Sequence, residues 1–307
     1  MVMQIYNNAN LNSKHLNGVI AIGNFDGLHL GHQKVINEAR LKAKKYKLPL
    51  GVMTFEPVPV MYFSKKLKDH RINSLSQKKL QLEKLKLDFL IIIKFDKSFS
   101  SLTAEQFIEK IIYKKTKCKY LYVSKNFRFG FKRKGSIKTL KKFENKFNYK
   151  NLIVKPFKKK NKVISSTLIR KKIREGKITE ANKLLNRNWV VDGKVVKGHK
   201  RGRKIGFPTC NLKMGNYVVP RLGVYAVKVK SSSFNKKGVA NIGYRPTFNG
   251  QSLLLETNIF GINKNLYNKV ISVSFKKFMR GEKKFKNIEH LKKQIKIDIK
   301  KAKKDYV

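Results

Sequence analysis

The sequence predicts a two-domain protein in which an α/β domain with a parallel sheet precedes a domain of antiparallel strands. Three observations lead to this expectation. The chain has 307 residues, of which 41% are hydrophobic, enough for two ordinary cores. Up to about residue 185, strand and helix patterns alternate, which is typical of a doubly wound parallel sheet. The later part contains short alternating runs separated by Gly, Asn and Pro, which is typical of an antiparallel sheet or small barrel.

Apolar runs and their spacing indicate the elements of the first domain. Val19–Ile22 indicates a strand that enters a glycine turn, and Val35, Ile36, Ala39 and Ala43 then recur at helical spacing. Further strands are expected at Leu50–Phe55, Phe89–Ile93 and Tyr120–Val123, and further helices at Leu82–Leu87, Ala104–Ile112 and Thr167–Glu175. Ligands of such a sheet bind at the carboxyl ends of its strands.

The second domain shows runs with a period of two residues. Strands are expected at Trp189–Val196, Gly223–Val229, Gly238–Ile242, Leu253–Phe260 and Lys269–Phe275. A final helix should begin near Ile288, because Leu291, Ile295 and Ile299 follow at intervals of four residues. The pattern changes near Leu184–Arg187, so we expect domains over residues 1–185 and 186–307.

The chain is strongly basic, with 72 Lys+Arg against 18 Asp+Glu and a formal net charge of +54. Such a charge could serve nucleic-acid binding. However, the basic residues run from Lys14 to Lys304 without forming one segregated tail. We therefore favour a solvated, lysine-rich surface on a protein whose ligands are small phosphates, with no specific nucleic-acid partner.

The sequence shows no sign of a membrane or secretory destination. No run of about 18 apolar residues occurs, and Met1–Asn10 is polar, without the apolar core of a secretion signal. The two cysteines, Cys118 and Cys210, are too few for a disulfide framework and are expected to be buried free thiols. These features favour a cytoplasmic protein that does not bind membranes.

The densest motif is Gly23-Asn24-Phe25-Asp26-Gly27-Leu28-His29-Leu30-Gly31-His32. Its glycines allow a tight turn close to a ligand, and the turn leads into a helix N-terminus, which attracts phosphate. His29 and His32 are three residues apart, so both can face one site. Two imidazoles beside a nucleotide can stabilise charge that develops on a pentavalent phosphorus. They could instead be metal ligands, but neither a third His nor a Cys lies nearby.

A second motif, Ile164-Ser165-Ser166-Thr167-Leu168-Ile169-Arg170, combines hydroxyl groups with an arginine. The fixed fork of donors on Arg170 suits a triphosphate. Ser165 could also simply cap the following helix. The two roles are compatible, because a helix N-terminus is itself an anion site.

In these two motifs the sequence resembles the nucleotidylyltransferases, in the form found in bacterial bifunctional riboflavin kinase/FAD synthetases. The resemblance implies a Rossmann-like α/β nucleotidylyltransferase domain that joins FMN to the AMP part of ATP. It implies ATP contacts by Gly23, Phe25, Asp26, Gly27, His29, His32, Ser165, Ser166, Thr167 and Arg170. Thr54–Pro59 and Ser124–Gly130 resemble flavin-side segments, which implies FMN contacts by Pro57, Pro59 and Asn126. Two positions depart from the family pattern: Val58 replaces the usual His, and Ser124 the usual Gly.

The second domain carries a basic, glycine-rich loop, Gly198-His199-Lys200-Arg201-Gly202-Arg203-Lys204-Ile205-Gly206-Phe207-Pro208-Thr209-Cys210-Asn211. Such a loop can cradle a triphosphate. Thr209 and Asn211 face the same way on an extended chain and offer neutral oxygens to Mg²⁺ carried in with ATP. Glu256 lies in an apolar strand run and could take the proton from a substrate hydroxyl. The residue chemistry alone leaves a solvated turn and a surface glutamate equally open.

Here the sequence resembles the riboflavin kinases, whose glycine loop is followed by Pro-Thr-Ala-Asn; Cys210 replaces the alanine. The resemblance implies an antiparallel β-barrel kinase domain with a C-terminal helix, in which Thr209 and Asn211 hold Mg²⁺ and Glu256 is the base. It implies ATP contacts by Gly198, Arg201, Gly202, Gly206, Thr209 and Asn211, and flavin contacts by Arg280 and Glu282. Asn241–Phe248 and Leu266–Lys269 also match, although Asn268 replaces a usual Gly.

Together the resemblances cover nearly the whole chain and imply a bifunctional flavin-cofactor enzyme with His29, His32 and Glu256 as catalytic residues. Riboflavin is phosphorylated by Mg·ATP to FMN, and FMN is adenylylated to FAD with release of pyrophosphate. We expect riboflavin, FMN and ATP as ligands, and a monomer or weak oligomer. A nucleic-acid-binding protein is one alternative, but it leaves both nucleotide motifs unexplained. A nucleotidylyltransferase for another acceptor, such as a phosphorylated sugar alcohol or pantetheine phosphate, leaves Thr209, Asn211 and Glu256 unexplained.

Overall fold

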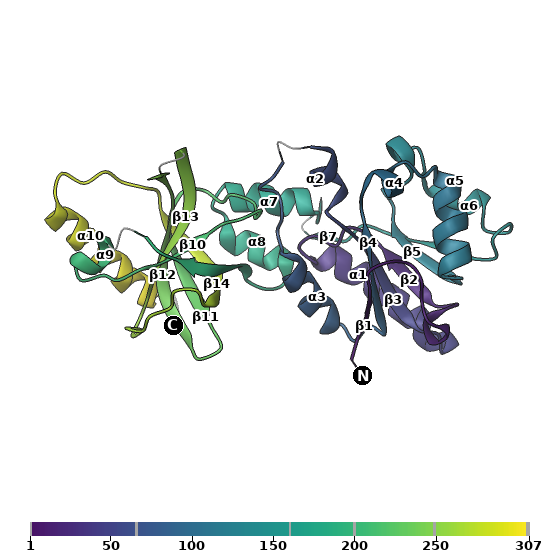
Figure 1. The fold of residues 1–307 in the computed structure, drawn as a ribbon, viewed down its shortest axis with the longest axis horizontal. Helices are drawn as coiled ribbons and strands as arrows, with labels where there is room; N and C mark the ends of the chain where they lie inside the picture. Colours follow the sequence, from purple (N-terminus) through teal and green to yellow (C-terminus); the bar gives the residue numbers. More distant parts are fainter. Residues whose placement is uncertain (1, 65–66, 160, 199–200, 248–249, 305–307) are drawn as a thin grey trace. The chain divides into compact units, whose positions relative to one another are not determined.

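The fold comes from a computed structural model of the chain, which describes residues 2–64, 67–159, 161–198, 201–247 and 250–304. Its internal contacts divide the chain into two compact units. The first unit comprises Met1–Lys68 and Leu75–Ser165, and the second comprises Asp69–Ser74 and Ser166–Val307. Figure 1 shows the elements of both units.

The first unit is built on a parallel sheet with the strand order β1-β4-β3-β2-β5-β6. The strands are β1 (Gln4–Tyr6), β2 (Val19–Ile22), β3 (Leu50–Glu56), β4 (Phe89–Lys94), β5 (Tyr120–Ser124) and β6 (Lys150–Val154). From β2 the chain moves outward through β3 to β4 and then returns to the other side of β2 with β5. This reversal creates a switch point beside β2, where open α/β sheets bind their ligands.

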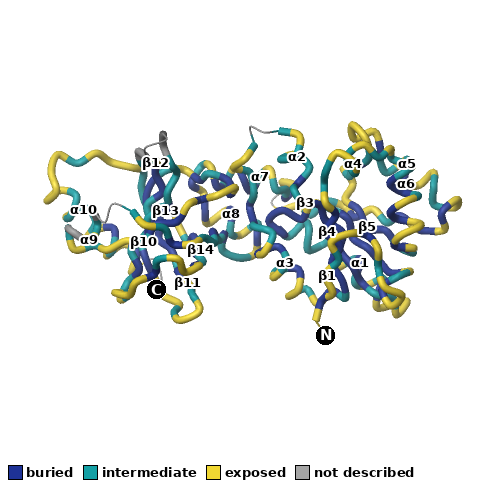
Figure 2. The backbone as a smooth tube through the Cα atoms, in the orientation of Figure 1, coloured by how far each residue is buried: buried dark blue, intermediate teal, exposed yellow. Residues whose placement is uncertain are grey.

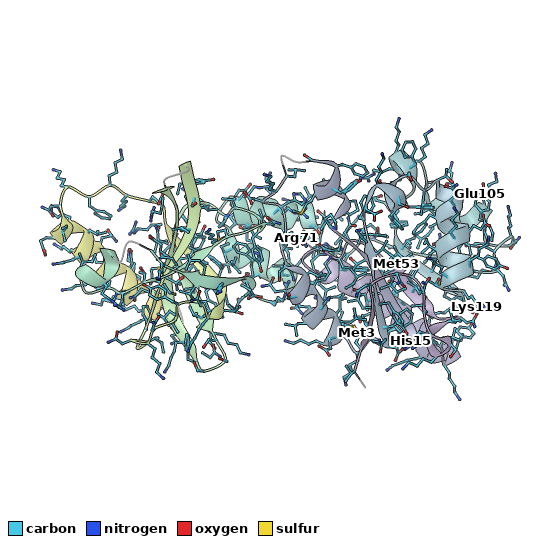
Figure 3. The ribbon with its side chains drawn as sticks, viewed as in Figure 1. Met3, His15, Met53, Arg71, Glu105 and Lys119 are labelled. Atoms are coloured by element: carbon cyan, nitrogen blue, oxygen red, sulfur yellow. The ribbon has the colours of Figure 1, made fainter. Side chains whose placement is uncertain are left out.

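Both faces of this sheet are covered, which is why its strands are nearly continuous apolar runs. On one face, Ala21 and Val52 join a core with Ala39 of α1 (Leu30–Tyr46). On the other face, Ile22 and Met53 join a second core with aromatic side chains (Figure 3). The central strands β2, β3 and β4 are accordingly almost entirely buried, and buried residues are dark blue in Figure 2.

Short helical segments connect the strands of the first unit. They are η1 (Ser13–His15), α2 (Pro59–Phe63), α3 (Leu75–Glu83), α4 (Lys97–Ser100), α5 (Ala104–Phe107), the π-helical η2 (Ile108–Lys115), η3 (Phe131–Arg133) and α6 (Ile137–Lys142). A small hairpin is formed by β7 (Lys158–Lys159) and β8 (Lys162–Val163).

The predicted doubly wound parallel sheet is confirmed. β2 has the expected bounds, and β3, β4 and β5 each extend one residue further than predicted. The helix predicted over Leu82–Leu87 is wrong, because α3 begins earlier and ends at Glu83. Lys86 adopts a positive φ of 51°, which turns the chain out of the helix and into β4. The predicted helix over Ala104–Ile112 is helical throughout, but it changes from α to π geometry after Phe107.

The second unit contains a closed antiparallel barrel with the strand order β10-β13-β12-β11-β14-β9, so the predicted barrel is confirmed. Its strands are β9 (Trp189–Val196), β10 (Cys210–Lys213), β11 (Gly223–Lys230), β12 (Asn235–Thr247), β13 (Gly250–Ile259) and β14 (Val270–Arg280). Leu212, Leu255 and Val273 fill the interior. β10 was not predicted, because its four residues show no recognisable alternation and are defined by their pairing with β9 and β13.

Helices α7 (Ser166–Arg174), α8 (Ile178–Leu185), α9 (Arg201–Lys204) and α10 (Ile288–Lys304) also belong to the second unit, and the predicted C-terminal helix is confirmed as α10. Asp69–Ser74 joins this unit as well. Trp189 Nε1 donates to the Ile72 carbonyl at 3.0 Å, and Arg71, labelled in Figure 3, forms an isolated bridge with Tyr217. The compact units therefore divide after Ser165, whereas the functional division at residues 185 and 186 stays a prediction.

Within the part of the chain that the structure describes, no helix combines the length and apolarity needed to cross a membrane. Cys118 and Cys210 are free thiols; Cys118 is buried, and Cys210 is only partly covered. Burial raises the pKa of each thiol to about 12. Both cysteines are therefore protonated and unreactive at neutral pH.

Candidate active sites

The first site lies at the carboxyl end of β2, where the predicted glycine turn forms. The Gly23 N–H donates to the Met53 carbonyl at 3.1 Å, which fixes the start of the turn against β3. Gly27 has a φ of 84°, a conformation that favours glycine. Phe25 is buried, and its ring meets the His32 ring edge-on at 5.2 Å. The turn is thus anchored at both ends.

His29 and His32 meet at the first turn of α1. Their rings stack with centroids 3.7 Å apart and 20° between the planes. His29 caps the helix, because its Nδ1 accepts from the His32 N–H at 3.4 Å. The proton of a neutral His29 ring therefore lies on Nε2, which can donate to a phosphoryl oxygen. Gly31 makes room for this ring, since a Cβ there would lie 3.1 Å from His29 Cε1 and 3.3 Å from the Ile164 carbonyl.

Two side chains that the sequence reasoning missed hold the turn from below. Thr54 Oγ1 donates to the Asn24 carbonyl at 3.1 Å, and Lys78 Nζ donates to the same carbonyl at 2.9 Å. Lys78 is only 1% exposed. In the sequence it resembled one of many surface lysines. The available signal was its spacing with Leu75 and Leu82, which places all three on the inner face of α3.

The other predicted residues of this site follow neighbouring strands. Pro57 and Pro59 come after β3, and Asn126 comes after β5. Because β3 and β5 flank β2 and run parallel to it, these residues lie at the same edge of the sheet as the histidines. Asn126 is exposed in its turn, which the hydrogen bond from Phe127 N–H to the Ser124 carbonyl closes at 3.0 Å. Contact of these residues with a flavin stays a prediction.

Three aromatic side chains at this edge were also missed. Tyr62 and Phe63 of α2 contact Phe95, which follows β4. The ring centroids are 5.2 Å apart for Tyr62 and Phe63, 5.3 Å for Tyr62 and Phe95, and 5.7 Å for Phe63 and Phe95, and the planes are nearly perpendicular. Phe63 remains 66% exposed. We call Tyr62, Phe63 and Phe95 the aromatic ledge. A partly exposed aromatic cluster at this edge suits a flat ring system. The sequence did not reveal it, because α2 and Phe95 follow two different strands, β3 and β4.

The predicted triphosphate motif is divided between the two units. Ser165 ends the first unit, whereas Ser166, Thr167 and Arg170 belong to α7 in the second. Arg170 is 7% exposed, and its Nε donates to the His70 carbonyl at 2.8 Å. This bond fixes the direction of the guanidinium. Contact of the motif with ATP stays a prediction.

The second site is a row of polar residues on the outer face of the barrel. Glu256 of β13 lies opposite Asn211 of β10 and opposite Asn241 of β12. Residues that lie opposite each other in a ladder share one face of the sheet, and the neighbours of Glu256, Leu255 and Thr257, are buried on the other. The structure therefore brings the predicted base and a predicted metal ligand together.

The glycine loop closes against this row. Asn211 Oδ1 is buried and accepts no hydrogen bond from the residues described. A Cβ at Gly198 would lie 2.1 Å from Asn211 Nδ2, and a Cβ at Gly202 would lie 3.3 Å from Thr209 Oγ1 and 2.5 Å from the Phe207 carbonyl. Glycine at both positions thus lets the loop approach the two predicted metal ligands.

The remaining predicted loop residues are placed in part. Gly206 has a φ of 87° and ends the loop after α9. Arg201 begins α9, but its side chain, like residues 199 and 200, lies outside the described part of the structure. A pocket opens beside the loop, lined by Val195, Thr209, Cys210, Thr257, Leu266 and Tyr267 among others. Thr257, which the sequence reasoning missed, is 1% exposed, and its Oγ1 has no partner among the described residues.

Glu256 is ion-paired, which the sequence reasoning also missed. Its Oε2 lies 2.7 Å from Nη2 of Arg245 on β12, and Arg245 Nη1 lies 3.5 Å from Oε1 of Glu282. The hydrogen bond to Glu256 raises the pKa of Arg245, so the guanidinium remains charged. One arginine therefore joins the predicted base to one of the predicted flavin contacts.

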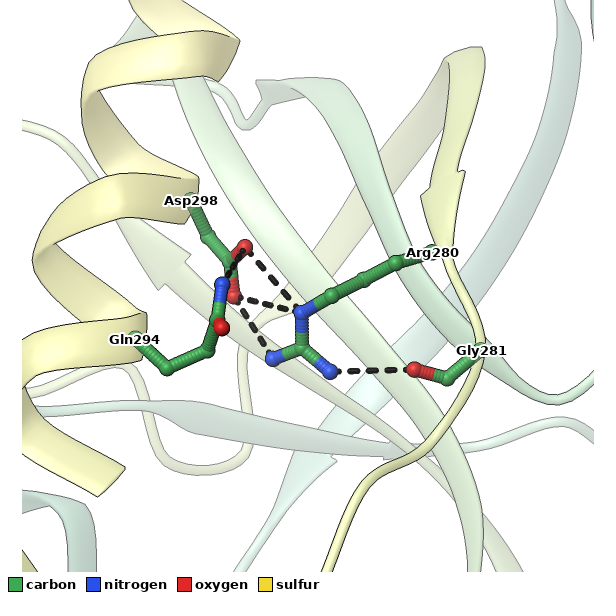
Figure 4. Close-up of polar contacts among 4 residues, drawn as sticks. All are labelled: Arg280, Gly281, Gln294 and Asp298. Carbon is green, nitrogen blue, oxygen red and sulfur yellow. Dashed lines mark hydrogen bonds and ion pairs between the residues drawn. The ribbon is translucent and has the colours of Figure 1, made fainter. Parts of the chain in front are cut away.

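Arg280, a predicted flavin contact, ends β14 and is held by α10 (Figure 4). Its Nε lies 3.1 Å from both carboxylate oxygens of Asp298, and its Nη2 lies 2.7 Å from Oδ2. Nη1 donates to the Gly281 carbonyl at 3.0 Å, and Gln294 Nε2 donates to Asp298 Oδ1 at 3.0 Å. Asp298 is 3% exposed. In the structure Arg280 fixes the helix to the end of the strand, and its contact with flavin stays a prediction.

Comparison with known proteins finds similarity along nearly the whole chain. Residues 11–168 match the family model of FAD synthetase, and residues 185–306 match that of riboflavin kinase. The chain is 40% identical over 309 residues to the bifunctional riboflavin kinase/FMN adenylyltransferase of Buchnera aphidicola subsp. Schizaphis graminum, covering 99% of this chain and 98% of the relative. It is 40% identical to the protein of the same name from Haemophilus influenzae, covering 92% of each.

A crystal structure of a protein from Streptococcus pneumoniae also resembles this chain, with a TM-score of 0.87, 30% sequence identity and 99% coverage of both chains. That protein is described as a macrolide-efflux protein. That name describes the other protein. For this chain, the likeness shows that the fold of each unit also occurs in that structure.

We predict that Asp298→Asn destabilises the second unit. The change leaves the Arg280 guanidinium partly buried without its counter-charge, and breaking a buried ion pair in this way costs about 3–5 kcal/mol. Because the Arg280 side chain keeps 18% exposure, we expect the lower end, ~3 kcal/mol. Urea unfolding followed by the fluorescence of Trp189, the single and buried tryptophan of the chain, reports on this unit.

Glu289→Gln is the matched control on the same helix. Glu289 pairs with Lys292 at 2.9 Å, but its side chain is 77% exposed, so its loss should leave the urea midpoint of unfolding nearly unchanged. Equal effects of the two substitutions would show that the Asp298 pair does not stabilise the barrel.

Proposed function

The chain belongs to the family of bifunctional riboflavin kinases/FMN adenylyltransferases, and we propose which of its residues carry each of the two reactions. The enzyme phosphorylates riboflavin to FMN with ATP, and it adenylylates FMN with a second ATP to give FAD and pyrophosphate. One observation carries the proposed division of labour. Each compact unit holds its own constellation, the stacked His29 and His32 in the first and Glu256 beside Asn211 in the second.

In our proposal, residues 1–185 form the adenylyltransferase domain and residues 186–307 the kinase domain. The matches to the two family models, over residues 11–168 and 185–306, support this division. Helix α7 would then serve the first reaction through Ser166, Thr167 and Arg170, although it belongs to the same compact unit as the barrel.

For adenylyl transfer, a phosphate oxygen of FMN attacks the α-phosphorus of ATP. A new P–O bond forms, the bond to the β-phosphate oxygen breaks, and pyrophosphate leaves with its electron pair. His29 Nε2–H and the His32 ring lie at a helix N-terminus with no acidic residue in its first turn. This environment favours negative charge, so the pair can stabilise the charge that develops on the α-phosphate oxygens.

The rest of the first site would bind the two substrates. Gly23, Phe25, Asp26 and Gly27 shape the turn around the nucleotide, and Ser165, Ser166, Thr167 and Arg170 bind its triphosphate. Pro57, Pro59 and Asn126 place FMN at the neighbouring strand ends. The aromatic ledge begins in the helix that starts at Pro59, and we add it to the proposed FMN site as the surface for the isoalloxazine ring.

For the kinase reaction, the 5′-hydroxyl of the ribityl chain attacks the γ-phosphorus of ATP, and ADP leaves. Glu256 takes the hydroxyl proton as the new P–O bond forms. The loop residues Gly198, Arg201, Gly202 and Gly206 cover the phosphates, and the adjoining pocket receives the rest of the nucleotide. Arg280 and Glu282 contribute to the flavin side.

The two families use ATP with a divalent metal, and we propose Mg²⁺ for this chain. No cluster of three or more His, Cys, Asp and Glu side chains suited to a metal exists among the described residues, so the ion would depend on neutral oxygens and on the phosphates of ATP. The buried Asn211 Oδ1, which has no described hydrogen-bond partner, fits such a ligand. Asn211 and Thr209 would hold the ion, which neutralises charge on the phosphates.

We propose a cytoplasmic enzyme that works as a monomer or weak oligomer and has no specific nucleic-acid partner. The basic surface would attract its anionic substrates by long-range electrostatics.

We predict that the purified chain converts riboflavin and Mg·ATP first to FMN and then to FAD. Chromatography of samples taken over time should show FMN rising before FAD, with ADP and pyrophosphate released in turn. A folded preparation that forms neither flavin nucleotide would contradict the assignment of both reactions.

We predict that the two reactions can be separated by mutation. His29→Ala together with His32→Ala should let FMN accumulate and reduce FAD formation by about a hundredfold or more, because loss of one such contact costs ~3 kcal/mol. Glu256→Ala should block FMN formation, while FMN supplied directly is still converted to FAD. If either variant lost both activities while keeping its native Trp189 fluorescence, the division of labour would be wrong.

We predict that Asn211→Ala raises the Mg²⁺ concentration needed for half-maximal kinase rate by about tenfold, equivalent to ~1.4 kcal/mol of lost binding. The Mg²⁺ dependence of FAD formation by the same preparation is the control and should not change. A kinase rate with an unaltered Mg²⁺ dependence would remove Asn211 from the metal site.

A further inference from the structure

Arg245 lies between two carboxylates that come from distant parts of the chain. Glu256 is on the neighbouring strand β13, and Glu282 follows the end of β14. The Arg245 side chain is 29% exposed, and the side chains of Glu256 and Glu282 are 30% and 41% exposed. Partly exposed ion pairs of this kind add little to the free energy of unfolding, so stability alone does not account for this three-residue cluster.

The backbone beneath this cluster is shaped to admit it. A Cβ at Gly243 would lie 2.2 Å from Glu282 Oε1 and 2.7 Å from Arg245 Nη1. A larger residue at position 243 would therefore require the ends of these two side chains to move. Asn241, two residues earlier on the same face, turns its amide oxygen toward Arg245 Nη2 at 2.6 Å and donates its amide N–H to the Gly223 carbonyl at 3.3 Å.

The contact with Arg245 uses only one of the two carboxylate oxygens of Glu256. Arg245 takes Oε2 at 2.7 Å, whereas Oε1 makes no hydrogen bond to the residues described. A carboxylate that projects from the outer face of a barrel could otherwise adopt several rotamers. The planar guanidinium fixes one of them, and its two terminal nitrogens can contact two carboxylates at once, which a lysine could not do with the same geometry.

We infer that Arg245 is a positioning residue of the kinase reaction, which holds Glu256 with Oε1 directed to the substrate hydroxyl and is itself held by Glu282. This inference rests on the proposed role of Glu256 as the base. Glu282 lies two residues beyond Arg280, on the segment assigned to the flavin. The orientation of the Glu256 carboxylate thus depends, through Arg245, on the position of the segment that carries Glu282.

The first test measures kcat and KM of the kinase reaction for Arg245→Ala and Arg245→Lys. We expect Arg245→Ala to lower kcat about tenfold to a hundredfold, with KM for ATP changed less than about twofold, because orientation of the base affects the chemical step. Arg245→Lys keeps the charge but loses the fork, so it should recover only part of kcat. An unchanged kcat in Arg245→Ala would overturn the inference.

Two matched variants test the geometry. Gly243→Ala leaves every polar group in place but crowds the pair, and it should reproduce most of the kcat loss. Ser252→Ala, opposite Arg245 on β13, should leave kcat unchanged. FAD formation from supplied FMN, together with Trp189 fluorescence, shows that each variant is folded. Full kinase activity in Gly243→Ala would contradict the inference even if Arg245→Ala failed to fold.

A double-mutant cycle separates this inference from the proposed base. If Arg245 acts through Glu256, Arg245→Ala should lower kcat less than about twofold in a Glu256→Gln background. Multiplicative losses would show that Arg245 acts independently and would overturn the inference while the base assignment stands. Full kinase activity in Glu256→Gln alone would instead remove the base and the inference with it.

The same cycle with Glu282→Gln tests the second contact. Glu282→Gln should lower kcat in the native background and have no further effect in Arg245→Ala. A loss that persists without Arg245 would show that Glu282 acts on the flavin directly and does not hold Arg245.

Discussion

A buried ion pair between Arg280 and Asp298 joins distant parts of the second unit. It joins the end of β14 to α10 and so fixes both ends of the segment that carries Glu282. Glu282 in turn contacts Arg245, and Arg245 contacts Glu256. A helix at the end of the chain is thereby connected, through two arginines, to the carboxylate assigned as the base. Neither arginine could be replaced by lysine without losing the geometry, because each uses several nitrogens of one guanidinium.

The first unit fixes its glycine turn with hydrogen bonds. Its nucleotide turn is held by main-chain bonds and by two donors, Thr54 and Lys78, that share the Asn24 carbonyl. Burying the Lys78 ammonium is expensive unless polar groups surround it. Its Nζ donates to the Asn24 carbonyl at 2.9 Å and to Thr54 Oγ1 at 3.3 Å, so the bonds that hold the turn also offset part of the cost of burial. The histidine pair then follows from helix geometry, because residues three apart meet on one face of α1.

The sequence could predict what depends on neighbours along the chain, and much less of what depends on pairing across the sheet. The four central strands β2 to β5, the glycine turn and the His29–His32 pair follow from local periodicity and composition, whereas the edge strands β1 and β6 were not predicted. β10, the Arg245 contacts and the Arg280–Asp298 pair depend on partners far along the chain, which no spacing rule identifies. The α3 error has the same origin: Leu82 and Leu87 are both buried, but the turn at Lys86 between them is fixed by where β4 must begin.

The distribution of charged residues explains how so basic a chain can still contain specific sites. With 18 acidic residues against 72 basic ones, most lysines have no carboxylate to pair with and must remain solvated. Glu256, Glu282 and Asp298 are each paired with an arginine. Glu256 in particular could otherwise attract any of the neighbouring cations and lose its orientation. In our proposal, the Arg245 contact commits Oε2 of the base to one partner in a strongly positive field and leaves Oε1 for the substrate.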